Sequence, residues 1–414
     1  MGHGVWLVLL LLFSTASSAS AGDWPQFLGP HRTGISEESG LIDSFPASGP
    51  PVVWRTPLGV GMSSISVVGN NVYTMYQDAQ HQYVVALDAR SGEKLWQTRV
   101  AESYRNAMGN GPRATPTVLK DSVFAFTGEG ILCALNRKDG ELRWSAATHK
   151  EPGGRAAEYG MASSPLVVGQ TVVVQTASRD GAVAGYDVET GKRRWAAGNG
   201  AAGYSSPVLM KLAGRPQIVA FVGAMVLSID PADGSELWRY DYVTDYDCNT
   251  ASPLQLDDSS VLVSAGENHG STILKVTTSG DGLEAKPGWS SLGKDSVLRA
   301  EWQTPVLHDG HLFALDNVGS AGPITNLVCV RIADGQQVWR QPRFGKSNLM
   351  LADGKLFLTT MKGELVLVKA STNGFEEISR ATILQQMTRQ APVIAAGRLY
   401  LRDDSEVVCL DVSK

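Results

Sequence analysis

Residues 84–96 read VVALDARSGEKLW, a phrase that recurs along most of the chain. A short apolar strand ends at Asp88, a glycine follows at Gly92, and a tryptophan comes four residues later at Trp96. The same glycine–tryptophan spacing returns at positions 140/144, 191/195, 234/238 and 335/339. Successive tryptophans, with Trp289 in a longer copy, stand roughly 43 to 51 residues apart. A period of this length indicates a repeat fold rather than several unrelated domains.

A second phrase lies between the tryptophans and consists of small residues, usually a proline, and two alternating strands around a tight turn. Examples are ATPTVLKDSVFAFTG (114–128), SSPLVVGQTVVVQTA (163–177) and QTPVLHDGHLFALD (303–316). Alternating β-branched and aromatic residues predict strands, and Asp309-Gly310 is typical of a two-residue hairpin turn. Each repeat therefore supplies four strands, which is one blade of a β-propeller. The phrase begins near residues 63, 113, 162, 204, 250, 302, 346 and 388, so the prediction is an all-β, eight-bladed propeller.

The two ends of the repeat region are incomplete in complementary ways. The last copy, VVCLDVSK (407–414), stops before its glycine and tryptophan, whereas PPVVWRTPL (50–58) has a tryptophan and no strand in front of it. We predict that residues 51–58 form the outer strand of the eighth blade, so that the N- and C-terminal segments close the ring and leave no unpaired edge there. In the irregular copy LVLVKASTNGFEEIS (365–379), Ile378 is predicted to take the tryptophan position. The tryptophans predicted to dock neighbouring blades are Trp54, Trp96, Trp144, Trp195, Trp238, Trp289 and Trp339.

The N-terminus reads MGHGVWLVLLLLFSTASSASAG, an apolar run followed by small residues. We interpret residues 1–21 as a secretory signal peptide cleaved near Ala21, although it has no Lys or Arg before the apolar run. That run is too short to span a bilayer. The expected mature protein is periplasmic or extracellular, with an N-terminal extension (residues 22–50) packing on a propeller that spans residues 51–414. Trp24 and Phe27 are expected to pack near the eighth or first blade, with coverage of one mouth of the channel as the alternative.

The charged residues and the cysteines restrict the possible partners and cross-links. The chain has 36 Lys and Arg against 41 Asp and Glu, without the basic footprint of a nucleic-acid binder. We expect no nucleic-acid partner, no transmembrane segment and a monomer. Cys329 and Cys409 align with Ala86 of the first copy, and Cys133 is one position away, so all three belong to third strands of non-adjacent blades. Because such strands are too far apart for a disulfide, these cysteines are predicted to be buried free thiols; Cys248 falls in a loop.

The chain resembles a known family in several of these phrases. The Gly-x-x-x-Trp repeat, the opening DWPQFLGPHRTGIS (23–36), GPRATPTV (111–118) and AGYSSPVL (202–209) are similar to quinoprotein-type (PQQ-repeat) propellers. Within them, the chain is most similar to an exported, PQQ-binding-like subset common in planctomycete-type bacteria. That subset is described by its likeness to the propeller lipoprotein of the outer-membrane β-barrel assembly machinery. The resemblance covers residues 23–414 and implies the fold more strongly than any activity, and this chain has no lipobox cysteine.

The resemblance also raises the question of a cofactor. A quinoprotein dehydrogenase holds PQQ over a Ca²⁺ ion, which needs several hard oxygen ligands. This sequence has neither the adjacent cysteine pair often found over the quinone nor a Cys-x-x-Cys-His haem motif. We therefore expect no cofactor and no metal, with PQQ and Ca²⁺ kept as the alternative.

The loops that lead into each innermost strand are expected to surround one mouth of the axial channel, where propellers usually bind ligands. They mix opposite charges with aromatic residues, which suits a polar ligand or a peptide loop, or simply solvated turns and ion pairs. The leading hypothesis is a non-catalytic scaffold propeller that binds a cell-envelope protein or polymer. The alternatives are a quinoprotein-like oxidoreductase and a carbohydrate-active enzyme that uses Glu158 and Glu301. The candidate binding residues are Arg105, Asn106, Arg113, Glu158, Tyr159, Tyr204, Asp247, Asn249, Glu301, Trp302 and Arg389.

Overall fold

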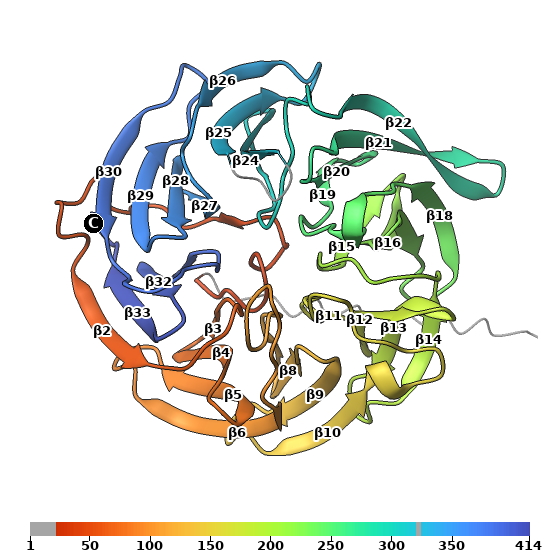
Figure 1. Cartoon of the computed structure of the whole chain (residues 1–414), viewed down its shortest axis with the longest axis horizontal. Helices are drawn as coiled ribbons and strands as arrows, with labels where there is room; N and C mark the ends of the chain where they lie inside the picture. Colours follow the sequence, from red (N-terminus) through yellow and green to blue (C-terminus); the bar gives the residue numbers. More distant parts are fainter. Residues whose placement is uncertain (1–21, 320–323) are drawn as a thin grey trace, which may run out of the picture.

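Eight β-sheets stand around a common axis in the computed structural model, which describes residues 22–319 and 324–414 (Figure 1). Each sheet is an antiparallel blade of four strands running outward from the axis, and one blade carries an additional fifth strand. Helical structure in the described residues consists of two single 3-10 turns, η1 (Thr148–Lys150) and η2 (Asp245–Asp247). The predicted eight-bladed, all-β propeller is confirmed. The predicted signal peptide, residues 1–21, lies outside the described residues.

The blades follow one another along the chain, each from its inner to its outer strand. The first four blades are β3 (Ser66–Val68), β4 (Asn71–Gln77), β5 (His81–Asp88), β6 (Lys94–Glu102); β7 (Thr117–Leu119), β8 (Ser122–Phe126), β9 (Ile131–Asn136), β10 (Leu142–Ala147); β11 (Leu166–Val168), β12 (Thr171–Ser178), β13 (Gly181–Asp187), β14 (Arg193–Ala197); and β15 (Val208–Leu212), β16 (Arg215–Phe221), β17 (Met225–Ile229), β18 (Glu236–Asp241). The next three are β19 (Leu254–Asp257), β20 (Ser260–Ala265), β21 (Gly270–Ser279), β22 (Gly282–Leu292); β23 (Val306–His308), β24 (His311–Val318), β25 (Ile324–Arg331), β26 (Gln337–Gln341); and β27 (Ser347–Ala352), β28 (Lys355–Thr360), β29 (Glu364–Lys369), β30 (Glu377–Thr382). The eighth is β31 (Val393–Ala395), β32 (Arg398–Arg402), β33 (Glu406–Asp411) and, from the other end of the chain, β2 (Val52–Pro57).

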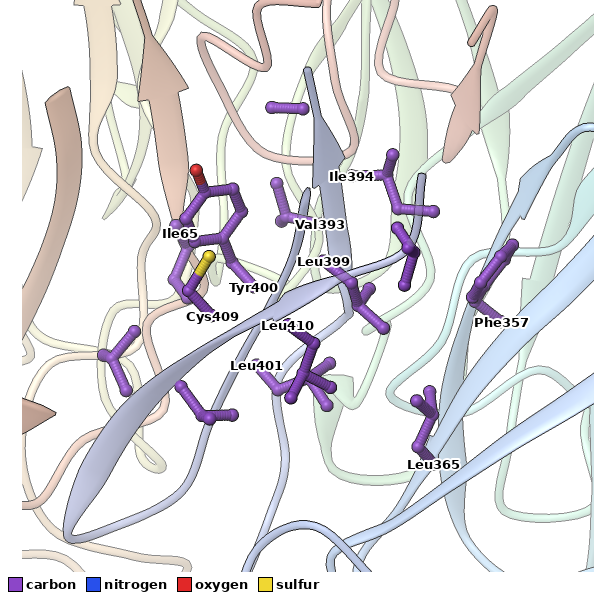
Figure 2. Close-up of a cluster of buried hydrophobic side chains, with 14 of the residues drawn as sticks. Ile65, Phe357, Leu365, Val393, Ile394, Leu399, Tyr400, Leu401, Cys409 and Leu410 are labelled. Atoms are coloured by element: carbon purple, nitrogen blue, oxygen red, sulfur yellow. The ribbon is translucent and has the colours of Figure 1, made fainter. Parts of the chain in front are cut away.

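The middle strands of each blade are buried on both faces, because every blade is covered by a neighbour on either side. All eight residues of β12 are buried, whereas the outer strand β6 alternates between buried and exposed positions. This explains why the second and third strands read as nearly continuous apolar runs. Figure 2 shows one such interface, where Leu399 and Leu410 of the eighth blade face Phe357 of the seventh.

The ring closes by pairing between the two ends of the chain, as predicted. Strand β2 lies antiparallel to β33, and Trp54 is opposite Cys409 in the same register that places Trp96 opposite Ala86 (Figure 1). The backbone N–H of Asp411 also donates to the carbonyl of Pro51 at 2.8 Å. The eighth blade is therefore a complete four-stranded sheet made from residues some 350 positions apart.

Most of the repeated tryptophans pack against the repeated glycine of the following blade. The indole of Trp54 lies so close to Gly92 that a Cβ there would approach the ring to 2.6 Å, and its Nε1–H donates to the carbonyl of Ala89 at 3.0 Å. The same contact with glycine is made by Trp96, Trp144, Trp195 and Trp289. Only glycine leaves this space open, and its left-handed φ of 74° at Gly92 is also disfavoured for other residues. The glycine–tryptophan spacing therefore reflects contact between blades rather than within one blade.

Three positions of the tryptophan column depart from this pattern. The Trp238 indole donates to Gln217 Oε1 of its own blade at 2.7 Å, and Trp339 instead stacks edge-on against Phe375 with ring centroids 6.2 Å apart. The assignment of Ile378 to the column is wrong. Ser379 holds that register place, opposite Leu367, because the connection between β29 and β30 is two residues longer than the one between β5 and β6.

Hydroxyl groups link the innermost parts of successive blades. From the first to the sixth blade, one Ser or Thr of the repeat donates its backbone N–H to the hydroxyl oxygen of its counterpart in the next blade, at 2.9 to 3.1 Å. The successive residues are Ser64, Thr115, Ser164, Ser206, Ser252 and Thr304, of which all but Ser64 precede a proline. Because these backbone groups are buried, each needs a partner. The Ser/Thr-Pro element of the repeat thus supplies a chain of hydrogen bonds around the axis.

The extension, residues 22–50, crosses one mouth of the channel, the mouth bordered by the hairpin turns (Figure 1). It begins on the first blade, where Trp24 and Val67 exchange two backbone hydrogen bonds, and touches the second blade through Pro25. Its strand β1 (Ile35–Ser36) then pairs in parallel with β27 at the inner edge of the seventh blade. The extension finally reaches the eighth blade, where the Glu38 carboxylate accepts the N–H of Ala396 at 2.6 Å and of Gly397 at 2.7 Å.

Arg32 fastens the middle of the extension to the far side of the ring. Its guanidinium is 2% exposed and donates to the carbonyls of Ser164 at 3.2 Å and Pro207 at 2.9 Å, and to that of Pro165. Burial lowers the pKa of Arg32 to about 9. The extension therefore spans the ring from the first blade to the third and fourth blades and returns to the seventh.

Candidate functional site

The opposite mouth is surrounded by the loops that connect each outer strand to the next innermost strand, here called the entry loops. They enclose a cavity of about 180 Å³ on the axis, the axial cup. Its walls include Met62, Met108, Arg113, Tyr159, Tyr204, Cys248, Trp302, Asn348 and Arg389, and Phe27 of the extension reaches it from the other mouth. Trp24 thus packs on the first blade, whereas Phe27 lies at the axis and closes the bottom of the cup.

Arg113 forms one fixed part of the wall. Its Nε–H donates to the carbonyl of Tyr159 at 2.8 Å, and its terminal nitrogens donate to the carbonyls of Gly109 at 2.7 Å and Gly111. Its guanidinium also lies 4.7 Å from the centre of the Tyr104 ring, a cation–π contact. Burial lowers the pKa of Arg113 to about 10, with a further contribution from repulsion by Arg389.

Two tyrosines from neighbouring entry loops form the next part of the wall. The rings of Tyr159 and Tyr204 lie 5.7 Å apart, and the Tyr204 hydroxyl accepts the backbone N–H of Tyr159 at 3.2 Å. Burial raises the pKa of both phenols, so each keeps its proton near neutral pH and can donate a hydrogen bond. The backbone of Tyr204 is held in turn by the carbonyl of Asn249 at 2.9 Å.

Arg389 enters the cup from the eighth blade's entry loop. Its Nη1 contacts the Met62 sulfur at 3.2 Å and donates to the carbonyl of Met108 at 3.1 Å. Its Nε is buried and has no hydrogen-bond partner. Loops more than 270 residues apart in sequence thus place Arg389 and Arg113 in one cavity.

Trp302 completes the wall, and Lys346 and Glu301 lie beside it outside the cup. The Lys346 ammonium lies 4.5 Å from the centre of the Trp302 ring and 3.8 Å from a carboxylate oxygen of Glu301. Glu301 is 7% exposed, and its other oxygen, Oε2, is buried without a hydrogen-bond partner. Burial therefore raises the pKa of Glu301 despite the attraction of Lys346.

The remaining predicted site residues lie outside the cup. Arg105 and Glu158 are exposed, and Asn106 donates to the backbone carbonyl of Glu158 at 2.8 Å. Asn249 is buried and holds the carbonyls of Val222 at 2.7 Å and Gly223 at 3.0 Å, which makes it a support of its loop rather than part of the surface.

Asp247 is half-buried and has a left-handed φ of 54° in the same loop. The sequence interpretation missed Met62, Met108, Cys248 and Asn348 as lining residues. Met62 and Met108 could have been noticed because each sits in a glycine-rich entry loop, GVGMSS or AMGNGP.

The donor set of the cup does not fit a Ca²⁺ ion. No Asp or Glu side chain is among the lining residues, and the nearby carboxylate of Glu301 is paired with Lys346. Within residues 22–319 and 324–414, no group of three or more His, Cys, Asp or Glu side chains could hold a metal ion. Because Ca²⁺ takes six to eight oxygen ligands, many of them carboxylates, the PQQ–Ca²⁺ arrangement has no support in these residues.

Comparison with known proteins assigns the family. A family model described as "Outer membrane protein assembly factor BamB" matches residues 38–161, 80–321 and 325–414. The chain belongs to this family. Its curated relatives include the outer membrane protein assembly factor BamB of Shewanella oneidensis, 34% identical over 115 residues, which is 27% of this chain and 26% of that protein. They also include the quinohemoprotein alcohol dehydrogenase ADH-IIG of Pseudomonas putida, 30% identical over 153 residues, 34% of this chain and 20% of that enzyme.

The solved structures agree on the fold. BamB from Moraxella catarrhalis superposes with a TM-score of 0.61 at 14% identity, covering 88% of this chain and all of that one. The curated alignments span about a quarter or less of those relatives' lengths. No helix in the described part of this BamB-family chain is long and apolar enough to cross a membrane.

Proposed function

We propose that this BamB-family propeller is an exported, non-catalytic scaffold that binds a cell-envelope protein through its entry-loop face. The main support for the proposal is that several exposed apolar side chains lie on or beside the entry loops. Val243 and Tyr246, 68% and 67% exposed, stand on the entry loop between the fourth and fifth blades. Met108, Leu292 and Met387 are exposed in or beside other entry loops. The other exposed large apolar residues of the described chain, Val52, Val53, Leu95, Leu142 and Leu209, lie within strands β2, β6, β10 and β15. Exposed apolar side chains on loops beside a cavity are typical of a protein-binding surface.

The cup favours binding over hydrolysis of a glycosidic bond. A glycosidase needs two carboxyl groups flanking one substrate. Glu158 is exposed on a loop, Glu301 is buried beside Lys346, and no acidic side chain lines the cup among the described residues. The names of the assembly-factor relatives support a scaffold role, whereas the dehydrogenase relatives would require a cofactor site that these residues do not provide.

Site-specific photo-crosslinking tests the proposal. A photoreactive phenylalanine analogue would replace Val243 or Tyr246 in the exported protein, and Leu95 in a control. Leu95 is 49% exposed but lies at the start of outer strand β6, away from the entry loops. We expect one envelope protein to be cross-linked from positions 243 and 246 and not from 95. Equal cross-linking from all three positions would contradict the proposal, as would micromolar binding of PQQ with Ca²⁺ measured by calorimetry.

A further inference from the structure

Two arginines in the axial cup have no carboxylate partner. Neither Arg113 nor Arg389 takes part in an ion pair among residues 22–319 and 324–414. Asp404 lies near enough to attract Arg389, but one of its oxygens is directed at the Gly61 N–H, at 3.4 Å. Glu301, on the other side, is paired with Lys346. The cup therefore carries two guanidinium groups that form no ion pair, although the Asp404 carboxylate attracts Arg389 from nearby.

The two arginines differ in what remains available to a ligand. Arg113 directs all three of its nitrogens to backbone carbonyls, so it contributes charge and little donor capacity. Arg389 donates only through Nη1, and its Nε is buried without a partner. A buried N–H with no acceptor is destabilising, and more so in a charged group. A ligand acceptor within reach of this N–H would remove that penalty.

The rest of the cup combines apolar and aromatic side chains with uncharged hydroxyl and amide groups, among them Thr250, Asn348 and Gln390. Phe27 closes the bottom, and Met62, Met108 and Trp302 line the sides. Tyr204 keeps its phenolic proton and adds a donor to the wall. The cavity of about 180 Å³ is below the roughly 300–1,000 Å³ of sites that enclose drug-sized ligands. It suits one small apolar group with one acidic end.

We propose that the axial cup binds a carboxylate carried on a small apolar or aromatic group, with Arg389 as its donor and Arg113 as a second positive charge. Carboxylates accept charge-assisted, bidentate hydrogen bonds from arginine, which are stronger than neutral ones. The apolar part of the ligand packs on Phe27, Met62 and Trp302. The acid is either a free small molecule or an acidic side chain of the partner polypeptide; only the second case rests on the function proposed above.

Matched acid and amide probes test the site in the full-length mature protein, without added metal. Phenylacetate and its neutral isostere phenylacetamide represent the free acid. The capped peptides Ac-Leu-Glu-Leu-amide and Ac-Leu-Gln-Leu-amide represent an acidic side chain on a polypeptide. We expect calorimetry to detect binding of the acid but not of the amide in at least one of the two pairs. The pair that binds identifies the source of the carboxylate.

Two arginine variants test the role of Arg389, one at the site and one as a control. Arg389→Gln removes the charged guanidinium with its unpartnered Nε but keeps a polar side chain with carbons as far as Cδ, so we expect roughly 10- to 100-fold weaker binding of the acid. Arg105→Gln removes an exposed arginine from a neighbouring entry loop outside the cup and should leave binding unchanged. The proposal is overturned if neither acid binds at concentrations up to about 10 mM, if acid and amide bind equally, or if the two variants bind alike. Cross-linking from Val243 or Tyr246 does not depend on the cup, so its outcome is separate.

Discussion

Trp54 is expected to hold the ring closed, and its replacement by alanine tests this directly. The side chain belongs to β2, is 7% exposed, and packs on Gly92 of the first blade while β2 itself pairs with the last strand of the chain. Trp54→Ala would leave a cavity at the one interface where the ring is closed by segments from opposite ends of the sequence.

The size of the effect follows from burial and from one hydrogen bond. Removing a buried tryptophan side chain costs about 3–5 kcal/mol in free energy of unfolding. Trp54→Phe keeps a ring over Gly92 but removes the indole N–H that donates to Ala89 at 3.0 Å, which costs about 1–2 kcal/mol. With an unfolding entropy of about 2.1 cal/mol/K per residue, a ring of about 390 residues loses roughly 5 °C in melting temperature for a loss of about 4 kcal/mol.

Urea denaturation and calorimetry measure these differences. Val53→Thr is the matched control, because Val53 is exposed in the same strand and threonine keeps the β-branched shape. We expect the order of stability to be wild type and Val53→Thr together, then Trp54→Phe, then Trp54→Ala. A role of Trp54 in closing the ring is contradicted if the free energy of unfolding of Trp54→Ala stays within about 0.5 kcal/mol of wild type, or if Val53→Thr loses as much stability as Trp54→Ala.

Two further predictions concern titratable groups. Burial raises the pKa of Glu301, so the folded state favours its protonated form; this stability is present at low pH and is lost as the pH rises through the folded pKa. Urea unfolding should therefore show the stability of Glu301→Gln increasing relative to that of wild type as the pH rises from about 4 to 7. A difference in free energy of unfolding between the two proteins that does not change with pH would contradict this prediction. Burial raises the pKa of the Cys248 thiol to about 12, and those of Cys133, Cys329 and Cys409 to about 12, 11 and 12. A thiol-reactive dye should label the native protein slowly and only at Cys248, and all four cysteines after denaturation; rapid native labelling at two or more sites would show that the third strands are accessible.

For the cup, the sequence predicted the loops but not which of their residues line the cavity. The entry loops were located correctly because each precedes a recognisable inner strand, and Arg113, Tyr159, Tyr204, Trp302 and Arg389 all line one cavity. Which residues of a loop point to the axis depends on its irregular backbone, which no periodic pattern encodes. Arg105 and Asn249 lie in the same kind of loop as the lining residues, yet one is exposed and the other supports the backbone.

Sequence by itself determined the number of blades, their four-stranded composition and the pairing of the chain ends. Each of these depends on contacts repeated every 40 to 50 residues, so the same residue types recur and the period is visible in one chain. The last copy of the repeat has no tryptophan strand after Val412, and this gap in the period indicated that the N-terminal segment pairs there. Ile378 was misplaced because two added residues in the connection before β30 shift the register without changing the pattern around it.

Only the tertiary structure decided the path of the extension and the contents of the cup. Arg32, Phe27 and Glu38 each make contacts that occur once, with blades far away in sequence. The two arginines without an ion pair, residues 113 and 389, come together because the ring brings the entry loops of the second and eighth blades to one axis. Contacts that occur once leave no period in the sequence. The residues that line the cup, and so its preference for a ligand, are therefore brought together only when the ring is folded.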